Sequence, residues 1–295
     1  MVSTELRQNL LFMEGVVKRY GPKTVLNGIN LSVGAGEFCT LVGPSGCGKS
    51  TLFRLILGQE RPSEGEMLFD GQPLGFPDES RGIVYQQYSL YPHLTVFQNV
   101  LLGRWLGMHP WQYWRQRREL RGEVEYHLEQ VGLMKHAGKY PHELSGGQQQ
   151  RVAIAQALIV RPRVLLMDEP FGALDASTRE RLQVFLLELW QQFRMSIIFV
   201  THDLIEAIFL GTRILVLSQF YSDDQGPAVD RGSKIVADYP SPWGKSVMPT
   251  DAKNDPAVQG LAQRILQDGF NPSHLQHVTE FNLRSRNSFP VETGR

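Results

Sequence analysis

The fold is decided by the stretch Gly43-Pro44-Ser45-Gly46-Cys47-Gly48-Lys49-Ser50. It follows a compact apolar run, residues 38–42, and leads into residues 49–57, where apolar side chains recur at helical spacing. A strand that passes through a glycine-rich loop into a helix is the arrangement of the phosphate-binding P-loop. The stretch therefore predicts an α/β core that binds a nucleotide.

The residue types in this loop indicate their chemical roles. Glycines let backbone N–H groups converge on phosphate oxygens, and the N-terminus of the following helix adds a favourable dipole. Lys49 is expected to reach the outer phosphates, and Ser50 is expected to ligate Mg²⁺. Thr51, the next residue, is placed in the same nucleotide site. Cys47 contributes its backbone, so its thiol is interpreted as a small space-filler rather than a redox centre.

Composition limits the class of protein. With 295 residues and 42% hydrophobic content, the chain suits one large α/β domain or a core with an appendage. Lys+Arg and Asp+Glu are both 30, so any nucleic-acid or membrane partner has to be argued locally. The cysteines, Cys39 and Cys47, suggest no disulfide framework. We find no secretory signal and no apolar run near the roughly 20 residues that span a bilayer, so a peripheral membrane role is expected.

A second chemical signal lies at the end of another apolar run, residues 164–167, which is followed directly by Asp168 and Glu169. Such a strand delivers its carboxylates to the carboxyl edge of a sheet, where ligands of α/β proteins bind. Asp168 is expected to hold the Mg²⁺ shell, and Glu169 is expected to polarise an attacking water as general base. The alternative interpretation is a solvated strand end.

The remaining pattern predicts an α/β fold. Residues 10–17 and 24–33 are expected to be antiparallel strands joined by a turn at residues 20–22. Residues 96–160 show a mostly helical pattern, with an apolar stripe at Val124, Leu128 and Val131. Further strands are expected, mostly in a parallel sheet, at residues 83–85, 164–167, 197–200, 214–217 and 234–239. A short helix is expected at residues 257–266, and residues 219–232 are polar and turn-like.

The run Leu144-Ser145-Gly146-Gly147-Gln148 heads a helical stretch upstream of the carboxylates, and this combination resembles the signature of the ATP-binding cassette (ABC) family. Ser145 can cap the helix while glycine amides face outward, which makes a second anion site. One chain cannot easily use both anion sites. The resemblance implies a head-to-tail dimer in which the signature of one subunit closes on the γ-phosphate of ATP held by the other.

Further motifs follow in family order. Tyr20 resembles the aromatic residue that stacks on adenine, although a locally packed turn tyrosine remains the alternative. Gln86 resembles the glutamine that senses metal and attacking water, with the adjacent Gln87 as the alternative. His202 resembles the switch histidine that contacts the γ-phosphate. Asp175 resembles a residue of the loop that links the two sites of the dimer. Gly172 stands where many members carry serine, which puts a hydroxyl contribution there in doubt.

The resemblance implies a domain plan. Residues 1–240 are expected to be the ABC ATPase domain, with a P-loop (RecA-like) core, an N-terminal antiparallel β subdomain and an α-helical signature subdomain at about residues 88–160. Residues 241–295 are expected to be a C-terminal extension without an assigned role.

The resemblance also implies a function. The stretches 168–175 and 201–210 look most like the ATPases of bacterial nitrate/sulfonate/taurine-type importers. Such an ATPase is expected at the cytoplasmic face of the inner membrane as a peripheral subunit. Its expected partners are separate permeases, a second copy of itself or a related ATPase, and indirectly an extracytoplasmic solute-binding protein, but no nucleic acid. Residues 88–99 are expected to contact a short cytoplasmic helix of each permease.

Other functions stay open at this point. One is a soluble ABC ATPase that acts on ribosomes or DNA, but such proteins usually carry two cassettes or a long coiled-coil insertion, and neither is visible here. Another is the ATPase of an ABC exporter. A P-loop kinase or GTPase would explain the P-loop but would leave the signature and His202 unexplained. The transported solute is not encoded in an ATPase that never touches it.

The stretch Trp111-Gln112-Tyr113-Trp114-Arg115-Gln116-Arg117-Arg118 interleaves aromatic residues with arginines. Such a composition can bind single-stranded nucleic acid or a membrane surface. We expect instead that the aromatic residues pack inward and the arginines form a solvated face, because this is the usual arrangement of an amphipathic helix. Contact with a transmembrane partner is the main alternative.

Replacing Lys49 with alanine tests the P-loop assignment. The change removes the cation that faces the β- and γ-phosphates, so ATP hydrolysis should be abolished while the fold stays intact. Turnover of purified Lys49→Ala would be measured with contaminating ATPases excluded, and the circular dichroism spectrum would report on the fold. Near-wild-type turnover in a folded variant would contradict the assignment.

Overall fold

The computed structural model describes residues 9–87, 89–106, 108–228, 230–242 and 255–278. The chain divides into two compact units. The first comprises Met1–Pro77 together with Ser196–Arg295, and the second comprises Asp78–Met195.

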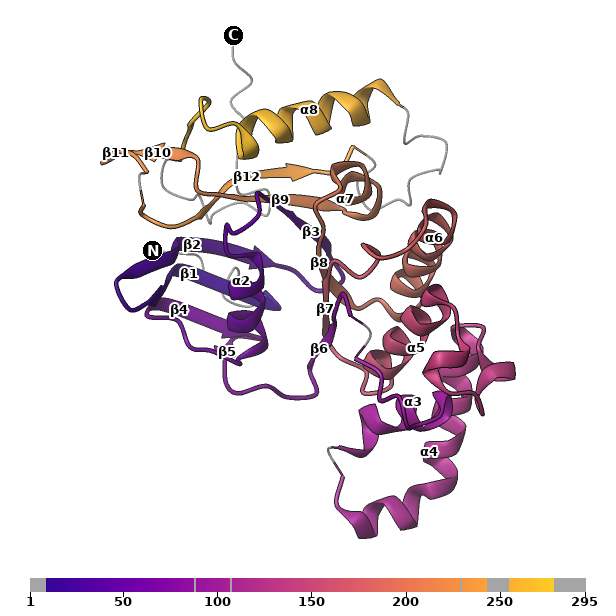
Figure 1. Cartoon of the computed structure of the whole chain (residues 1–295). Helices are drawn as coiled ribbons and strands as arrows, with labels where there is room; N and C mark the ends of the chain where they lie inside the picture. Colours follow the sequence, from indigo (N-terminus) through magenta and orange to yellow (C-terminus); the bar gives the residue numbers. More distant parts are fainter. Residues whose placement is uncertain (1–8, 88, 107, 229, 243–254, 279–295) are drawn as a thin grey trace. The chain divides into compact units, whose positions relative to one another are not determined.

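The N-terminal part of the first unit forms an antiparallel sheet in the order β2–β1–β4–β5 (Figure 1). Its strands are β1 Leu11–Tyr20, β2 Lys23–Val33, β4 Glu64–Phe69 and β5 Gln72–Pro73. Tyr20 pairs with Lys23. Gly21 and Pro22 therefore make the turn, and Gly21 has the positive φ of 58° that suits a tight turn. The predicted antiparallel opening is confirmed, while β4 and β5 were not predicted.

A second sheet of the first unit is built around the buried strand β3. Its strands are β3 Phe38–Val42, β8 Ser196–Val200, β9 Arg213–Ser218 and β12 Lys234–Pro240. β3 lies between β8 and β9 and runs parallel to both, whereas β12 is antiparallel to β9. Every residue of β3 and β8 is buried, as expected for parallel strands covered on both faces.

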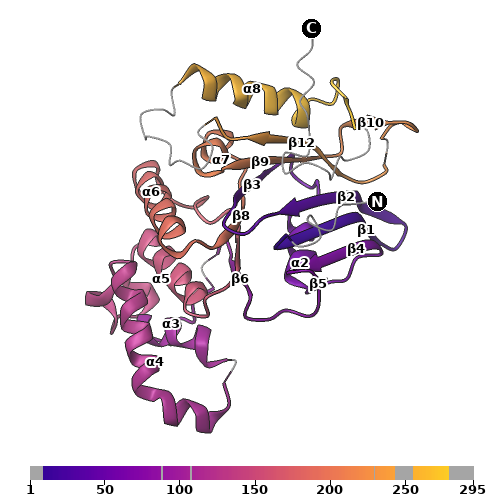
Figure 2. The same cartoon turned by 180° about the vertical axis from the view of Figure 1, so that it is seen from behind.

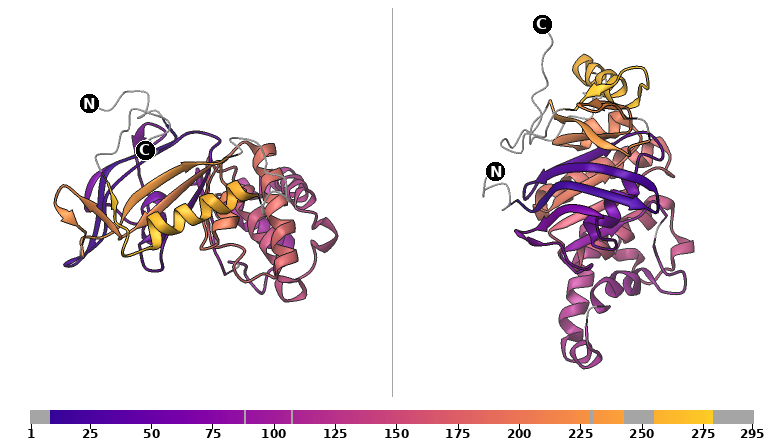
Figure 3. Two further views of the ribbon diagram at one scale, coloured as in Figure 1. Left: turned by 90° about the horizontal axis from the view of Figure 1, so that it is seen from above. Right: turned by 90° about the vertical axis from the view of Figure 1, so that its left-hand side faces the viewer.

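Helices α2 Lys49–Leu57, α7 Leu204–Leu210 and α8 Pro256–Phe270 complete the core of the first unit. The bounds of β3 and α2 match the prediction. α8 packs against α7, β9 and β12, along which it runs in Figures 2 and 3. Ser218 donates its hydroxyl to the Gly269 carbonyl over 2.6 Å, and Tyr239 donates to Asp268. α8 is thus fastened to the sheet by buried hydrogen bonds.

The polar stretch at residues 219–232 contains a small hairpin. β10 Tyr221–Asp223 pairs antiparallel with β11 Gly226–Pro227 and parallel with β13 Gln276–His277. Asp223 forms two ion pairs. Its Oδ1 lies 2.9 Å from Arg231 Nη1, and its Oδ2 lies 3.2 Å from Lys234 Nζ. Sequence periodicity missed these strands because each is only two or three residues long and depends on partners distant in the chain.

The second unit combines a pair of parallel strands with a group of helices. Its strands are β6 Arg81–Val84 and β7 Val164–Asp168. Its helices are α3 Val96–Trp105, α4 Pro110–Gln130, α5 Gly146–Leu158 and α6 Ala176–Phe193, with 3₁₀ turns η1 Met134–His136 and η2 Pro141–Glu143. α5 packs against β6, α3, α4 and α6. The helical pattern is confirmed, and the stripe of Val124, Leu128 and Val131 is buried.

Arg213 and Asp238 form a buried ion pair that joins β9 to β12. Arg213 donates from Nε to Asp238 Oδ1 over 2.8 Å and from Nη1 to the Ser32 carbonyl over 2.6 Å. Glu37 lies 3.3 Å from the same Nη1. Burial alone would lower the pKa of Arg213, but the hydrogen bond with Asp238 and the nearby carboxylates raise that pKa above its ordinary value. The guanidinium therefore stays charged and ties β2, β9 and β12 together.

Replacing Arg213 with methionine should destabilise the protein by about 3–5 kcal/mol, because it removes the buried cation that pairs with the carboxylate of Asp238. The double variant Arg213→Met/Asp238→Leu should recover part of that loss, since both charges are then removed. Urea unfolding followed by circular dichroism would give the free energies. A single variant as stable as the wild type would show that the pair does not hold these strands.

Candidate active site

The P-loop begins where β3 ends, at a glycine with no room for a side chain. A Cβ on Gly43 would lie 2.0 Å from the Leu217 carbonyl oxygen of β9. At the other end of the loop Gly48 has φ of 97°, and a Cβ there would lie 2.9 Å from the Leu26 side chain. Both positions require glycine, one for close approach and one for its left-handed backbone. The loop path is therefore dictated by its packing against β2 and β9.

The N-terminus of α2 is arranged to receive an anion. Gly48 is the N-cap and supplies no side-chain hydrogen bond to the helix, so the first backbone N–H groups of α2 remain to be satisfied by something else. Ser45, Gly46 and Ser50 are exposed. Lys49 Nζ donates to the carbonyls of Gly43 over 2.7 Å and Pro44 over 3.0 Å. Its ammonium thus lies over the loop whose backbone would hold phosphate.

Cys47 faces inward from the loop and is buried. Its Sγ would lie 2.9 Å from a Cβ on Gly43, so it fills the space beneath the start of the loop. Burial raises the pKa of the Cys47 thiol, with Lys49 opposing the effect. A protonated, buried thiol agrees with the space-filling role predicted for it.

Tyr20 is the last residue of β1 and is 41% exposed. Its hydroxyl donates to Glu60 Oε2 over 2.5 Å, and Lys18 Nζ lies 5.0 Å from its ring centroid. The hydrogen bond from Tyr20, together with Lys18, holds the pKa of Glu60 below its ordinary value. The hydrogen bond to Glu60 anchors the hydroxyl end of the ring. Stacking of the ring on adenine stays a prediction.

His202 follows β8 and is exposed between two anchored neighbours. Thr201 is buried and donates its hydroxyl to Glu206 Oε2 over 2.5 Å. Asp203 caps α7 by accepting from the Glu206 N–H over 3.0 Å. Because both flanking residues are tied to Glu206, the backbone at His202 is restrained, which suits a residue that has to meet a phosphate at a defined position.

In the second unit, β6 and β7 bring the predicted glutamine and carboxylates to one sheet edge. The strands are parallel, with Val84 opposite Met167, so Gln86 and Asp168–Glu169 follow at neighbouring carboxyl ends. Glu169 has the left-handed φ of 45°, which is uncommon for a residue with a side chain. This backbone turns the chain sharply after Asp168.

Gly172 lies directly beside Gln86. A Cβ on Gly172 would be 3.3 Å from Gln86 Nε2 and 3.5 Å from the Glu169 carbonyl oxygen. The Gly172 N–H also donates to that carbonyl over 3.1 Å. The glycine therefore leaves space for the Gln86 amide next to the turn that carries Glu169. In the sequence Gly172 departs from the family pattern, and the sequence by itself offers no reason for a glycine at this position.

The signature residues form the N-terminus of α5 as predicted. Ser145 is the N-cap, and its Oγ accepts from the Gln148 N–H over 3.4 Å. The Gln148 side chain returns this by accepting from the Ser145 N–H over 3.0 Å, which completes a capping box. Ser145 is exposed, whereas Gly147 is buried. This is the second helix N-terminus in the chain with the composition of an anion site.

Asp175 is joined to the signature through Thr178, a residue that sequence reasoning missed. Asp175 caps α6 by accepting from the Thr178 N–H over 3.0 Å and from the Ser177 hydroxyl over 2.8 Å. These hydrogen bonds lower the pKa of Asp175 to about 2. A Cβ on Gly147 would lie 2.5 Å from Thr178 Cγ2. The start of α5 and the start of α6 therefore pack closely.

The structure thus groups the predicted residues by unit. The first unit holds Tyr20, residues 43–51 and His202, and the second holds Gln86, residues 145–148, Asp168, Glu169 and Asp175. For Mg²⁺, Ser50 offers a hydroxyl on the first turn of α2, while Gln86 and Asp168 offer oxygens at one sheet edge. Oxygen donors of this kind fit Mg²⁺ held together with phosphate, a mode that needs few protein ligands.

A glycine-rich loop between a buried strand and a helix defines a P-loop nucleotide-binding protein. Comparison with known proteins narrows the class. A family model described as ABC transporter matches residues 26–172. The nitrate import ATP-binding protein NrtD of Synechocystis sp. is 46% identical over 202 residues, which cover 68% of this chain and 74% of NrtD.

Two further proteins are similar. The spermidine/putrescine import ATP-binding protein PotA of Chromobacterium violaceum is 47% identical over 212 residues, which cover 71% of this chain but only 57% of PotA. The solved structure of cbiO1 from Clostridium perfringens, part of the ABC transporter complex cbiONQ, is 28% identical and has a TM-score of 0.68. That similarity covers 87% of this chain and 99% of cbiO1.

The chain belongs to the ABC transporter family and is an ATPase of that family. The predicted fold class is confirmed by the likeness to cbiO1, and the predicted resemblance to nitrate-type importer ATPases is confirmed by NrtD. Within the ranges that the structure describes, no helix combines the length and apolarity needed to cross a bilayer.

The role of Tyr20 can be tested by substitution. If the ring stacks on adenine, Tyr20→Ala should weaken ATP affinity by about 1–3 kcal/mol, whereas Tyr20→Trp should largely preserve it. Tyr20→Phe is the matched control, because it keeps the ring and removes only the hydrogen bond to Glu60. Calorimetric titration would give the affinities. Equal affinity in all four proteins would return Tyr20 to a local packing role.

Proposed function

We propose that this chain is the ATP-hydrolysing subunit of a bacterial importer and closes with a second copy, or with a related ATPase, around two ATP molecules. Residues 1–240 would act as the ATPase domain, at the cytoplasmic face of the membrane beside separate permease subunits. The transport of a small solute delivered by an extracytoplasmic binding protein is supported by the import functions in the names of NrtD and PotA.

One observation carries the dimer proposal: the chain offers two helix N-termini suited to phosphate. α2 begins at Gly48 without a side-chain cap, and α5 begins at an exposed Ser145 with the signature glycines behind it. Each can neutralise an anion through backbone N–H groups. A head-to-tail pair lets one nucleotide use α2 of one copy and α5 of the other, and two-fold symmetry then repeats the site.

Each predicted site residue would have its own role in ATP hydrolysis. The P-loop backbone and Lys49 bind and orient the phosphates, and Glu169 accepts the proton of the attacking water. His202 contacts the γ-phosphate, while Gln86 orients water beside Glu169. Mg²⁺, held by Ser50, Asp168 and Gln86, would supply charge neutralisation at the phosphate oxygens. Asp175 would pass the state of one site to the other, because it caps α6 against the signature turn of α5.

The proposed contact of residues 88–99 with a permease is supported by the fixed conformation of the chain just before α3. Asn99 is buried, and its Nδ2 donates to the carbonyls of Tyr91, Leu94 and Thr95 at 3.2, 2.9 and 3.0 Å. Its Oδ1 accepts from the Tyr91 N–H over 2.8 Å. One buried amide thus holds residues 91–95 in a fixed shape. Residue 88 of the segment predicted to contact the permease lies outside the described residues.

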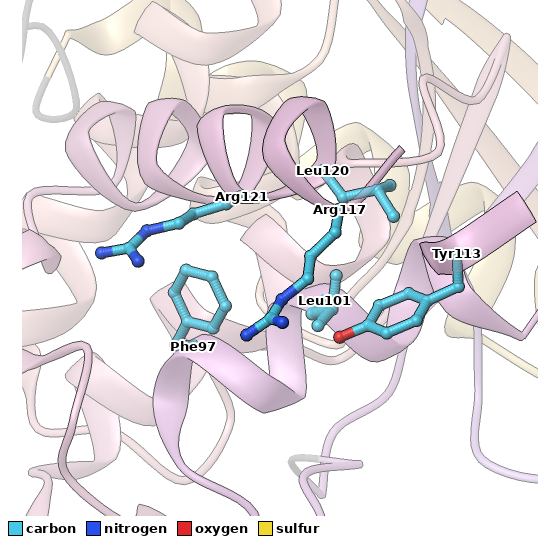
Figure 4. Close-up of a pocket in the computed structure, with 6 residues that line it drawn as sticks. All are labelled: Phe97, Leu101, Tyr113, Arg117, Leu120 and Arg121. Atoms are coloured by element: carbon cyan, nitrogen blue, oxygen red, sulfur yellow. The ribbon is translucent and has the colours of Figure 1, made fainter. Parts of the chain in front are cut away.

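A pocket between α3 and α4 offers a place for the permease helix to dock. It encloses about 300 Å³ and is lined by Phe97, Leu101, Tyr113, Arg117, Leu120 and Arg121 (Figure 4). Figure 4 shows the Phe97 ring and the two guanidinium groups around this space. A pocket lined by apolar and aromatic side chains and by two arginines suits a short amphipathic helix that carries a carboxylate.

ATP-driven dimerisation of a hydrolysis-deficient variant tests the proposal. Glu169→Gln keeps the shape of the side chain but removes the charge that polarises water, so hydrolysis should fall by at least about 100-fold. ATP binding should persist, and bound ATP should then link two copies. Light scattering with and without ATP should show the mass of a monomer become that of a dimer.

Adding Gly146→Asp should abolish that dimer, because it places a carboxylate against the γ-phosphate. An aspartate on the first turn of α5 is compatible with the helix dipole, so the fold should survive. Gly146→Asn in the same background is the matched control without the charge and should dimerise better. If the Glu169→Gln protein dimerises with ATP and Gly146→Asp leaves that unchanged, the signature does not close on ATP.

A further inference from the structure

The N-terminal turns of α4 expose tryptophans that were predicted to pack inward. Trp111 is 55% exposed and Trp114 is 70% exposed, so that prediction is wrong. Arg115 and Arg118 are exposed as predicted. The four positions are spaced i, i+3, i+4 and i+7, which places them on one side of the helix. We call these four residues the Trp–Arg face.

The Trp–Arg face differs from the pocket on the same helix. The pocket uses Tyr113, Arg117, Leu120 and Arg121, which lie at other positions of the helical turn. Exposed apolar side chains also continue onto the end of α3, where Trp105 and Leu106 are 46% and 72% exposed. The apolar surface is therefore a patch that spans two helices.

Aromatic contacts give this patch a defined arrangement. The Tyr113 ring lies 6.4 Å from Trp105 and 6.3 Å from Trp114, measured between centroids, and both pairs are edge-to-face. The Arg117 guanidinium lies 5.9 Å from the Trp114 ring. Tyr113 thus joins the end of α3 to the start of α4 while the indoles remain exposed. A contiguous exposed apolar patch of this kind usually marks a binding surface.

The charge around the patch is strongly positive. Between residues 104 and 121 there are Arg104, Arg115, Arg117, Arg118 and Arg121, against the single acid Glu119. Arg104 is paired with Glu79, and Arg121 with Glu125. Within the part of the chain that the structure describes, Arg115, Arg117 and Arg118 form no ion pair. Arg115 and Arg118, the two cations of the Trp–Arg face, therefore remain for an external anion.

We propose that the Trp–Arg face binds the anionic headgroup region of a lipid bilayer. Tryptophan prefers this region because its ring is amphipathic, and arginines are attracted by the negative surface of lipids that carry phosphate and net charge. A helix with tryptophans and basic residues on one face lies in the interface without crossing it. This inference rests on the proposed function, since a permease would hold the chain beside the membrane where the face can touch lipid.

A bilayer explains the surface better than a nucleic acid does. A nucleic-acid groove tracks a backbone with a long row of charges, whereas here the cations and indoles are concentrated on the first turns of one helix. The chain as a whole is neutral, with 30 basic and 30 acidic residues, so no long-range field would attract a polyanion. A bilayer surface offers anionic headgroups to the arginines and an apolar layer beneath them to the indoles, so it can contact both at once.

Vesicle flotation with the full purified chain tests this. Wild-type protein should float with mixed phosphatidylcholine–phosphatidylglycerol vesicles, should float less with phosphatidylcholine alone, and should be released by salt. Arg115→Gln/Arg118→Gln should weaken partition into the anionic vesicles on the order of 25-fold, because each basic residue near such a surface contributes about a factor of 5. Trp111→Gln/Trp114→Gln should reduce flotation with both kinds of vesicle.

Two matched controls separate the face from general surface chemistry. Lys135→Gln/Lys139→Gln removes two exposed charges from the same unit, and Phe76→Gln removes another exposed aromatic ring that has an arginine, Arg61, over it. Both controls should float like the wild type. All variants should hydrolyse ATP at the wild-type rate, because none of these residues belongs to the nucleotide site.

The outcomes distinguish this inference from the proposed function. It is overturned if the wild type does not float, or if the face variants float no less than the controls, while ATP hydrolysis is normal. It is also overturned if the tryptophan variant floats normally but no longer co-purifies with permeases, or if the face binds single-stranded oligonucleotide in preference to vesicles. Face-dependent flotation by a chain without ATPase activity would instead contradict the proposed function alone.

Discussion

The close approach of Gly43 to β9 is the constraint on which the conformation of the P-loop depends. β3 is wholly buried between β8 and β9, and the Leu217 carbonyl occupies the place where a side chain of Gly43 would be. The loop can therefore leave β3 along one path only, and it turns into α2 through the left-handed Gly48. Because the backbone is held there by packing, its N–H groups are preorganised for phosphate rather than ordered by it.

The second unit also has a helix N-terminus suited to an anion, at α5, but the N-terminus of this helix is capped differently from that of α2. At α2 the helix N-terminus lacks a side-chain cap, whereas at α5 Ser145 and Gln148 cap one another. Gly147 packs against Thr178, the residue that also binds Asp175. If the signature binds the nucleotide of a second copy, as proposed, a pre-capped and closely packed helix start would reduce the entropy lost on binding.

The interactions that position the expected site residues differ from those that stabilise the strands. Residues with expected chemical roles, such as His202 and Glu169, lie in segments whose backbone is held by neighbouring hydrogen bonds. The strands behind them are held by burial and by the Arg213–Asp238 pair. The surface of α4 follows neither pattern, because its exposed tryptophans stabilise no core. Such a surface is unfavourable in water, and the lipid contact proposed for it would cover it.

The sequence alone determined the elements whose signals are local. The P-loop, β3, α2 and the helix cap at Ser145 follow from glycine, strand and cap chemistry within a few residues, and the structure confirms them. Only the tertiary structure decided the short strands β5, β10, β11 and β13, the contact of Gly172 with Gln86, and the exposure of Trp111 and Trp114. These depend on which distant segment lies alongside, and helical periodicity cannot tell a core-facing side of a helix from one that faces a partner.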